Sequence, residues 1–195
     1  MFKRSGRFNT GSCAYAVTSG SVTVAGWPGS TTQAGDAMRS ILGAMGASTK
    51  LTSTGLEVTG PEPGALRGLD IDLHDVGELT PVVAALAAQA STASRLRGVA
   101  HLRGHETDRL QALQTELSRM GGEVEVTDDG LLINPVPLHG ALLRTYHDHR
   151  MAMAAAVLGA GVPGVRVENV ATTAKTFPGF ASTWSQLVDA EPAPA

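Results

Sequence analysis

The amino-acid sequence predicts an α/β fold, and two observations support this prediction. Short stretches with strand character alternate with stretches whose apolar residues recur at three-and-four spacing, which is typical of helices. A pattern of strand, loop, helix and hairpin also occurs twice. The two helices end at Met45 and Met120 and the two hairpins contain Leu56 and Leu131, so both pairs of positions are 75 residues apart. Repetition at this length indicates a pseudo-symmetric domain built from α/β units.

The predicted strands are short and lie between the helical stretches. They cover residues 22–25, 69–73, 96–100, 122–126, 131–134 and 165–168. A Gly-Leu pair occurs in each copy of the hairpin, at Gly55 and at Gly130. A third and truncated copy of the repeat is expected to start at Gly164.

Two helices are predicted from amphipathic stripes. Apolar residues recur at three-and-four spacing over residues 38–45 and again over residues 110–120. Glycines follow both stripes, at Gly46 and Gly121. Glycine adopts the left-handed conformation without steric cost, so we expect both helices to end there.

Three further helices are predicted mainly from their start signals. Thr80 is expected to cap a helix whose first residue is Pro81, and because residues 82–90 are apolar on all sides this helix should be buried. Asp148 is expected to cap the next helix, and Pro178 to begin the last one.

Length and composition are those of one domain. With 195 residues, of which 43% are hydrophobic, the chain is long enough to bury about 70% of its unfolded surface in a single core. We expect this domain to span residues 16–190. Residues 1–15 are predicted to be an atypical amino-terminal segment and residues 191–195 a disordered tail.

Charge and cysteine content exclude several classes of function. Fifteen basic and eighteen acidic residues give a net charge of −3, so we expect no nucleic-acid partner and no anionic membrane surface. The single cysteine, Cys13, excludes an intramolecular disulfide. No apolar run approaches the roughly 18 residues that a bilayer-spanning helix needs. These features predict a cytoplasmic protein.

Chemically active side chains lie at or just before the starts of four predicted helices. They are Glu78, Glu106, Arg109, Arg150 and Lys175. Helix starts present unpaired N–H groups and a partial positive charge, which favour bound anions. If these starts converge, they form a pocket for a small ligand with several negative charges. Taken singly, each residue is more often structural, and Glu106 and Arg109 could simply pair on the surface of one helix.

Histidine pairs suggest a competing hypothesis of a metal site. His101 and His105 are four positions apart and His147 and His149 two positions apart, which are spacings found among metal ligands. Gly104 precedes the helix start, however, so the first pair need not share a helical face. Neither the P-loop nor the dinucleotide-binding glycine pattern occurs in the sequence.

Three segments resemble successive signatures of EPSP synthase, the family that transfers an enolpyruvyl group from phosphoenolpyruvate to shikimate 3-phosphate. They are residues 104–110 (GHETDRL), 146–153 (YHDHRMAM) and 174–178 (AKTFP), in the family's order and approximate spacing. Residues 72–81 (DLHDVGELTP) look like a fourth, in the form common among actinobacterial members. The resemblance covers about residues 20–190. It implies the carboxy-terminal half of the enzyme, an inside-out α/β domain of repeated βαβαββ units.

The resemblance also implies roles for individual residues. Glu78 matches the acid that takes the proton from the 5-hydroxyl of shikimate 3-phosphate, where many relatives have aspartate. Glu106 matches the carboxyl group implicated in proton transfer to the methylene carbon. Arg109, Arg150 and Lys175 match the cations that bind phosphoenolpyruvate and stabilise charge during addition and phosphate loss.

Two histidines stand at positions that contact shikimate 3-phosphate in the family. His101 stands where many relatives have asparagine, and His105 stands where many have lysine. No metal and no organic cofactor is implied. The expected partners are the two small-molecule substrates and a complementing amino-terminal half, and the full enzyme is expected to be a monomer.

Two other hypotheses remain open at the level of sequence. The nearest is the related enolpyruvyl transferase that acts on UDP-N-acetylglucosamine, although residues 148–153 and 175–178 argue against it. The other is a non-catalytic anion-binding domain left by truncation of a gene. Because the other wall of the cleft is missing, we expect little or no turnover by this chain alone.

Overall fold

The computed structural model describes residues 9–30 and 34–188, so the predicted tail at 191–195 and most of the predicted atypical segment lie outside the described residues. The α-helices are α1 (Asn9–Thr18), α2 (Ala37–Ala44), α3 (Thr80–Ala87), α4 (Arg109–Arg119), α5 (His149–Gly161) and α6 (Phe180–Val188). The strands are β1 (Ser21–Ala25), β2 (Ser48–Leu51), β3 (Gly55–Thr59), β4 (Asp70–Asp72), β5 (Ser94–Arg97), β6 (Glu123–Val126), β7 (Leu131–Asn134), β8 (Leu142–Leu143) and β9 (Arg166–Val167). Short 3-10 helices cover Ala34–Asp36, His74–Leu79, Ala100–Gly104 and Val170–Lys175.

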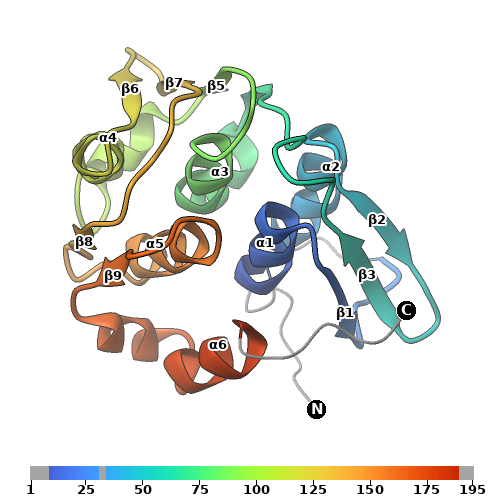
Figure 1. The fold of residues 1–195 in the computed structure, drawn as a ribbon. Helices are drawn as coiled ribbons and strands as arrows, with labels where there is room; N and C mark the ends of the chain where they lie inside the picture. Colours follow the sequence, from blue (N-terminus) through green and yellow to red (C-terminus); the bar gives the residue numbers. More distant parts are fainter. Residues whose placement is uncertain (1–8, 31–33, 189–195) are drawn as a thin grey trace.

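Three helices, α1, α3 and α5, pack against one another at the centre of the molecule (Figure 1). Every residue of α3 is buried, as predicted for a helix that is apolar on all sides. In α5 the sequence Met-Ala-Met-Ala-Ala-Ala presents small side chains, which let neighbouring helices approach closely. Helices therefore form the interior of this domain, and its sheets lie outside them.

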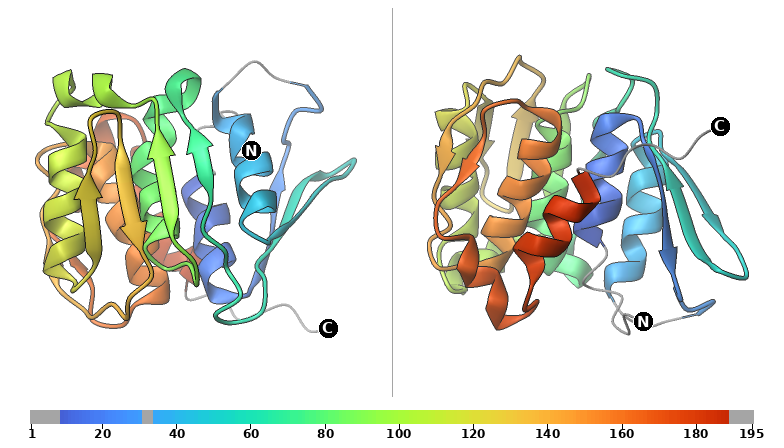
Figure 2. Two further views of the ribbon diagram at one scale, coloured as in Figure 1. Left: turned by 90° about the horizontal axis from the view of Figure 1, so that it is seen from above. Right: turned by 60° about the horizontal axis from the view of Figure 1, so that its bottom comes forward.

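The strands form three separate sheets around these helices (Figure 2). One sheet has the order β1-β3-β2 and is antiparallel. The second has the order β4-β5-β7-β6, in which β4 and β5 are parallel and the β6–β7 hairpin is antiparallel. In the third, β8 and β9 are parallel. The inside-out α/β arrangement expected from the sequence is thus confirmed.

The internal repeat is present in the structure down to the register of its hairpins. In the first copy Ser48 lies opposite Thr59, and in the second Glu123 lies opposite Asn134, so each pair is displaced by the same 75 positions. The glycines after the two stripes also match, since Gly46 and Gly121 have φ values of 103° and 86°. These are the left-handed stops that the sequence predicts.

The third copy, which was expected to start at Gly164, begins with strand β9. The unit β8–α5–β9 has the same parallel strand–helix–strand arrangement as β4–α3–β5. In the described part of the chain, no hairpin follows β9. The segment Val170–Lys175 and helix α6 come next instead.

Several predicted boundaries were wrong. Thr80 does not cap α3 but is its first residue, and its buried Oγ1 has no hydrogen-bond partner among the described residues. The last helix begins at Phe180, two residues after Pro178. Strand β5 ends at Arg97, because the backbone turns at Gly98 (φ 75°) into a 3-10 helix.

The packed domain extends beyond the predicted boundary at residue 16. Helix α1 begins at Asn9, and its Cys13 and Ala14 are buried in the interior. Burial raises the pKa of the Cys13 thiol, which therefore stays protonated at neutral pH. In the part of the chain that the structure describes, no helix combines the length and the apolar character needed to cross a membrane.

The repeat makes a prediction about its two hairpin glycines. A Cβ at Gly130 would collide with the carbonyl oxygen of Leu96, and one at Gly55 with the carbonyl oxygen of Val24. Either alanine substitution should lower the free energy of unfolding by roughly 1–3 kcal/mol, because the hairpin must shift to make room. Urea unfolding followed by circular dichroism measures this change.

The matched control is Gly43→Ala in α2, where no atom lies within 4 Å of an added Cβ. This substitution should raise the free energy of unfolding by about 0.5–1 kcal/mol, since alanine favours a helix over glycine. Equal effects of Gly43→Ala and Gly130→Ala would contradict the proposed close approach.

Candidate active site

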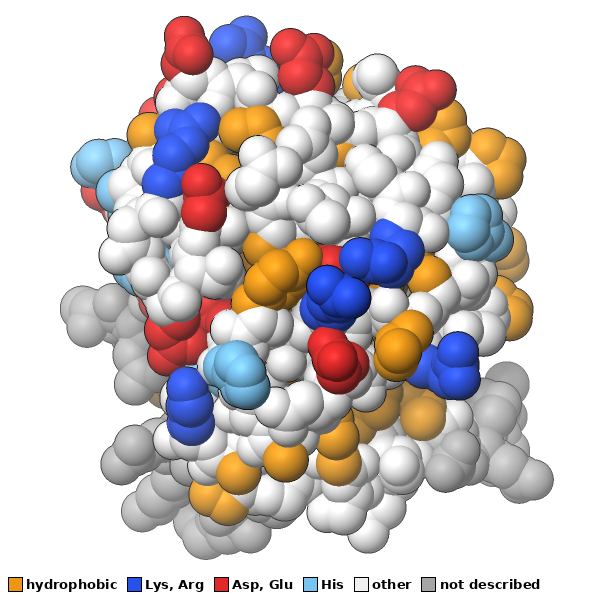
Figure 3. Space-filling view, turned by 90° about the vertical axis from the view of Figure 1, so that its left-hand side faces the viewer, with side chains coloured by type: hydrophobic (Ala, Val, Ile, Leu, Met, Phe, Trp, Pro, Cys, Tyr) orange, Lys and Arg blue, Asp and Glu red, His pale blue; other side chains and the backbone are white. Residues whose placement is uncertain are grey.

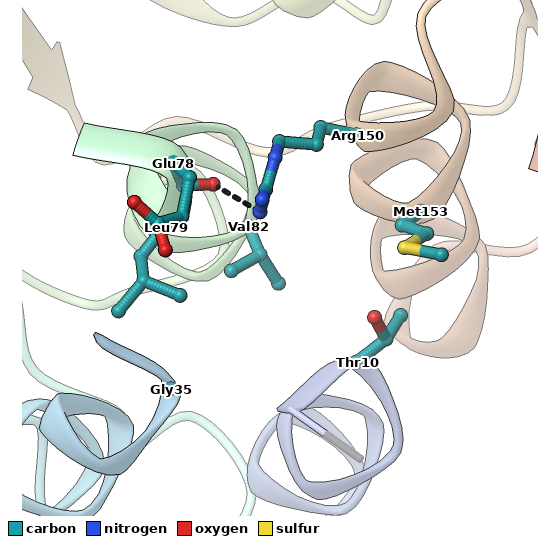
Figure 4. Close-up of a pocket in the computed structure, with 7 residues that line it drawn as sticks. All are labelled: Thr10, Gly35, Glu78, Leu79, Val82, Arg150 and Met153. Carbon is teal, nitrogen blue, oxygen red and sulfur yellow. Dashed lines mark hydrogen bonds between the residues drawn. The ribbon is translucent and has the colours of Figure 1, made fainter. Parts of the chain in front are cut away.

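The amino-terminal ends of the three inner helices meet around one pocket of about 80 Å³. Thr10 from α1, Glu78 and Leu79 at the start of α3, and Arg150 from α5 line it, together with Gly35, Val82 and Met153 (Figure 4). The carboxyl-terminal ends of the same helices line a different pocket, through residues that include Val17, Gln89 and Gly161. The inner helices are therefore parallel, and their partial positive charges add at the first pocket.

Arg150 connects the start of α5 to the start of α3. Its guanidinium donates a hydrogen bond of 2.8 Å to the backbone carbonyl of Glu78, and its backbone N–H donates one of 2.8 Å to Oδ1 of Asp148. Burial lowers the pKa of Arg150 below its ordinary value, although the nearby carboxylates of Glu78 and Asp148 oppose this. Arg150 thus stays positively charged beside the carboxyl group of Glu78.

Asp148 and Arg109 form a buried ion pair. Nε of Arg109 lies 2.7 Å from Oδ2 of Asp148, and their side chains are only 4% and 0% exposed. Burial alone would raise the pKa of Asp148, but the hydrogen bonds from Arg109 and from the Arg150 amide outweigh it and lower the pKa. One carboxylate therefore caps α5, as predicted, and also fixes Arg109 at the start of α4.

Lys175, Glu106 and His149 lie close together at the same end of the domain. Nζ of Lys175 donates to the carbonyl of His147 at 3.0 Å and lies 3.9 Å from Oε1 of Glu106. Nδ1 of His149 lies 3.8 Å from the other oxygen of Glu106. Burial, and then the charge of Arg150, lowers the pKa of His149, so its imidazole is neutral at neutral pH. Glu106 is thus the carboxylate between a cation and a neutral imidazole.

The carbonyl that holds Lys175 depends on an unusual backbone conformation. Tyr146 and His147 both have left-handed backbones, with φ values of 53° and 57°. Such residues cost roughly 1–2 kcal/mol each, so the surrounding contacts must impose the conformation. As a result the His147 carbonyl also accepts a hydrogen bond of 2.8 Å from Oγ1 of Thr172.

His101 and His105 lie in a second group next to Gly77, the residue before Glu78. The ring centroid of His101 lies 5.7 Å from that of His74 and 6.0 Å from that of His105. His101 also lies against Gly77, because a Cβ there would meet its Nε2 at 2.6 Å. The structure therefore brings the starts of α3, α4 and α5 together and places the two histidines at their edge. Lys175 lies beside them, but it ends the 3-10 helix Val170–Lys175 and precedes α6 by five residues, so its predicted place at a helix start was wrong.

The metal hypothesis finds little support in the described residues. Among them, the one group of three close metal-ligating side chains is Glu106, Asp148 and His149, with ligand atoms within 4.8 Å of one another. Asp148 already pairs with Arg109, so its charge is balanced. Neither predicted histidine pair belongs to a group of three such ligands in the described part of the chain.

Two contributors to the site were missed at the level of sequence. Asp148 was predicted only as a helix cap, and His149 only as a metal ligand. The signal for His149 lay in its position between Asp148 and Arg150 at a helix start. No local pattern indicated that Asp148 would pair with a residue 39 positions away.

A family model described as EPSP synthase (3-phosphoshikimate 1-carboxyvinyltransferase) matches residues 10–184. The chain belongs to the EPSP synthase family. The match begins within the segment 1–15 that was expected to be atypical, and it agrees with the packing of α1 in the interior.

Individual EPSP synthases and a related enzyme show the same similarity. The chain is 56% identical over 178 residues to a 3-phosphoshikimate 1-carboxyvinyltransferase from Kocuria rhizophila, an alignment that covers 91% of this chain and 40% of the relative. The fold matches an EPSP synthase from Acinetobacter baumannii with a TM-score of 0.79 at 24% identity, covering 92% of this chain and 44% of that one. It also matches the enolpyruvyl transferase NikO from Streptomyces tendae, with a TM-score of 0.69 at 20% identity over 92% of this chain and 41% of that one. The chain thus spans about two fifths of the length of these proteins.

The buried ion pair predicts a large effect of Arg109→Met. This substitution should lower the free energy of unfolding by about 3–5 kcal/mol, because it leaves the Asp148 carboxylate buried without its partner. The matched control is Arg97→Met. Nε of Arg97 lies 2.6 Å from Oδ1 of Asp70, but these side chains are 35% and 60% exposed, so stability should hardly change. Urea unfolding of both variants measures these changes. Similar losses of unfolding free energy in the two variants would refute the role assigned to burial.

His149 predicts a dependence of stability on pH. Its pKa in the folded chain is below the value of about 6.5 in the unfolded chain, so the unfolded chain binds more protons between the two. The contribution of neutral His149 to stability is therefore complete above about pH 6.5 and is lost as the pH falls below it. Between about pH 7.5 and 5.5 the free energy of unfolding should fall less in His149→Gln than in the parent chain. An equal fall in both proteins would count against this assignment.

Proposed function

We propose that this chain supplies one wall of the active site of a 3-phosphoshikimate 1-carboxyvinyltransferase. The reaction transfers the enolpyruvyl group of phosphoenolpyruvate to the 5-hydroxyl of shikimate 3-phosphate and releases phosphate. The observation that carries the proposal is that Arg109, Arg150, Glu78 and Glu106 converge near the starts of α3, α4 and α5, with Lys175 beside them. Family membership and the name of the 56% identical relative support it.

Phosphoenolpyruvate would bind to the three cations. Its phosphate and carboxylate groups carry the negative charge that the helix starts favour. Arginine binds such groups through two parallel hydrogen bonds, and no described residue accepts a hydrogen bond from the Nη atoms of Arg109. Lys175, which is half exposed, supplies a movable charge.

The proposed reaction begins with addition. Glu78 takes the proton from the 5-hydroxyl, and the oxygen forms a bond to the central carbon of phosphoenolpyruvate. The methylene carbon takes up a proton at the same stage, for which we propose the carboxylic acid form of Glu106 as the donor, which leaves Glu106 as a carboxylate. The product of this step is a tetrahedral intermediate that still carries the phosphate.

Elimination completes the transfer. The bond between the central carbon and the phosphate oxygen breaks, and the methyl group loses a proton, which restores the double bond. Arg109, Arg150 and Lys175 stabilise the charge that develops on the leaving phosphate. Glu106 is placed to recover the proton, since it lies between the Lys175 ammonium and the neutral imidazole of His149.

Shikimate 3-phosphate would occupy the side of the pocket next to Gly77. His101 and His105 lie there beside the segment that carries Glu78, and imidazole groups donate hydrogen bonds to hydroxyl and phosphate oxygens. We propose that both histidines contribute to binding of this substrate.

The partner of this chain is proposed to be the remaining part of an EPSP synthase. The chain spans 40% of the length of its Kocuria relative, so residues that face this wall across the cleft belong to the other part. We propose that the assembled enzyme is a monomer in the cytoplasm. On the face that carries α4, β8 and β9, basic, acidic and hydrophobic side chains are interspersed (Figure 3).

The test is enolpyruvyl transfer from phosphoenolpyruvate to shikimate 3-phosphate, followed by phosphate release. The chain alone should show little or no turnover, and mixing it with a separately expressed amino-terminal part should restore it. In the mixture, Lys175→Met should lower kcat by about 10²–10³-fold, because one charge at the leaving phosphate is lost. The matched control is Lys50→Met, at an exposed lysine on β2.

Three outcomes would contradict parts of this proposal. Ordinary turnover by the chain alone would refute the need for a second wall. No turnover in the mixture, with a folded chain, would favour a non-catalytic relic domain. Transfer to UDP-N-acetylglucosamine in place of shikimate 3-phosphate would assign the chain to the related cell-wall enzyme.

A further inference from the structure

Glu116 is a buried carboxylate that the proposed reaction does not use. It lies on α4 and is only 3% exposed. Oε1 accepts a hydrogen bond of 2.6 Å from the hydroxyl of Tyr146, and Oε2 accepts one of 3.0 Å from the backbone N–H of Arg144. Arg119 adds a contact of 3.1 Å to Oε2. A buried carboxylate with three donors is well satisfied, and two of these donors belong to one short segment.

That segment, residues 144–148, is here called the bend. It contains the two left-handed residues and ends at Asp148. Arg109 and Glu116 are seven positions apart, which places them two turns apart on one face of α4. Arg109 holds the end of the bend through Asp148, and Glu116 holds its beginning and middle. Helix α4 therefore binds the bend through two side chains, Arg109 and Glu116.

The conformation of the bend determines where two of the proposed ligand-binding cations lie. Asp148 fixes Arg109, and the His147 carbonyl fixes Lys175. Two consecutive left-handed residues are an uncommon arrangement that the surroundings must enforce. The hydrogen bonds of Glu116 to both sides of Thr145 are the contacts in the described residues that tie the first half of the bend to α4.

We infer that Glu116 is a positioning residue, which holds the bend in the conformation that places Arg109 and Lys175 for binding an anionic ligand. The identity of that ligand, phosphoenolpyruvate, rests on the proposed function. The role of Glu116 in holding the bend does not. Burial, and then Glu116, raises the pKa of Tyr146 to about 12, which agrees with a strong hydrogen bond between the two. Glu116 does not touch the ligand and acts through Asp148 and His147.

The first experiment uses the chain alone and needs no catalytic activity. The Arg109 Nε–H signal in ¹⁵N-edited NMR reports on the bond to Asp148. Glu116→Gln, which keeps the shape but removes the charge, should shift this signal and speed its exchange with water at least about tenfold. The control is Val58→Ala, a buried position in the β1-β3-β2 sheet, which lowers stability without touching the bend. If Glu116→Gln does not fold, Tyr146→Phe removes the shorter bond alone and should shift the signal in the same direction.

The second experiment measures turnover in the mixture with the amino-terminal part. Both variants should raise KM for phosphoenolpyruvate and lower kcat, reducing kcat/KM roughly tenfold to a hundredfold, while KM for shikimate 3-phosphate stays unchanged. A loss of stability alone would not raise the KM for one substrate and leave the KM for the other unchanged.

The outcomes of the two experiments are distinguishable. An unchanged Arg109 signal in both variants overturns the inference, whether or not the mixture is active. Full turnover with unchanged KM for phosphoenolpyruvate also overturns it and leaves the proposed function intact. If the unaltered mixture is inactive, the proposed function fails, and the NMR result alone decides the role of Glu116.

Discussion

The parallel packing of α1, α3 and α5 is the constraint on which the rest of the structure depends. Each helix start carries a partial positive charge of about half a unit, so three starts around one pocket repel one another. Asp148 offsets this at the start of α5, and Arg109 balances Asp148 in turn. A small ligand with several negative charges stabilises such an end further. The fold thus creates a site for anions before any particular side chain is considered.

Most of the fold could be predicted because its signals are local and repeated. The stripe at residues 110–120 and the glycine that follows it gave α4 to within one residue, and the 75-residue offset gave the equivalence of the two hairpins. Strand β8 was missed because its two residues are both leucine and show no alternation, unlike the Val-Arg-Val sequence that predicted the equally short β9. Thr80 was misassigned because threonine followed by proline is also compatible with a helix that begins one residue earlier, after Leu79.

The site was predictable only in part, for a related reason. Helix starts can be recognised from sequence, so Glu78, Arg109 and Arg150 could be placed near such starts, but the pattern left open whether these starts approach one another. The left-handed backbone of Tyr146 and His147 could not be foreseen, because nothing in a Tyr-His pair favours it. It depends on contacts with residues 25 to 30 positions away in sequence. Distant contacts of this kind leave no local signal.

At the start of α5, each residue of the sequence Asp-His-Arg makes a different contact with the site. The aspartate caps the helix and pairs with Arg109, the neutral histidine approaches Glu106, and the arginine reaches the carbonyl of Glu78. Three consecutive residues therefore connect α5 to the starts of α3 and α4. A shift of α5 along its axis would break all of these contacts together, so the position of this one helix couples the proposed base, Glu78, to the proposed anion-binding cations. Because α5 is also the helix most deeply packed against α1 and α3, the hydrophobic core itself sets the geometry of the site.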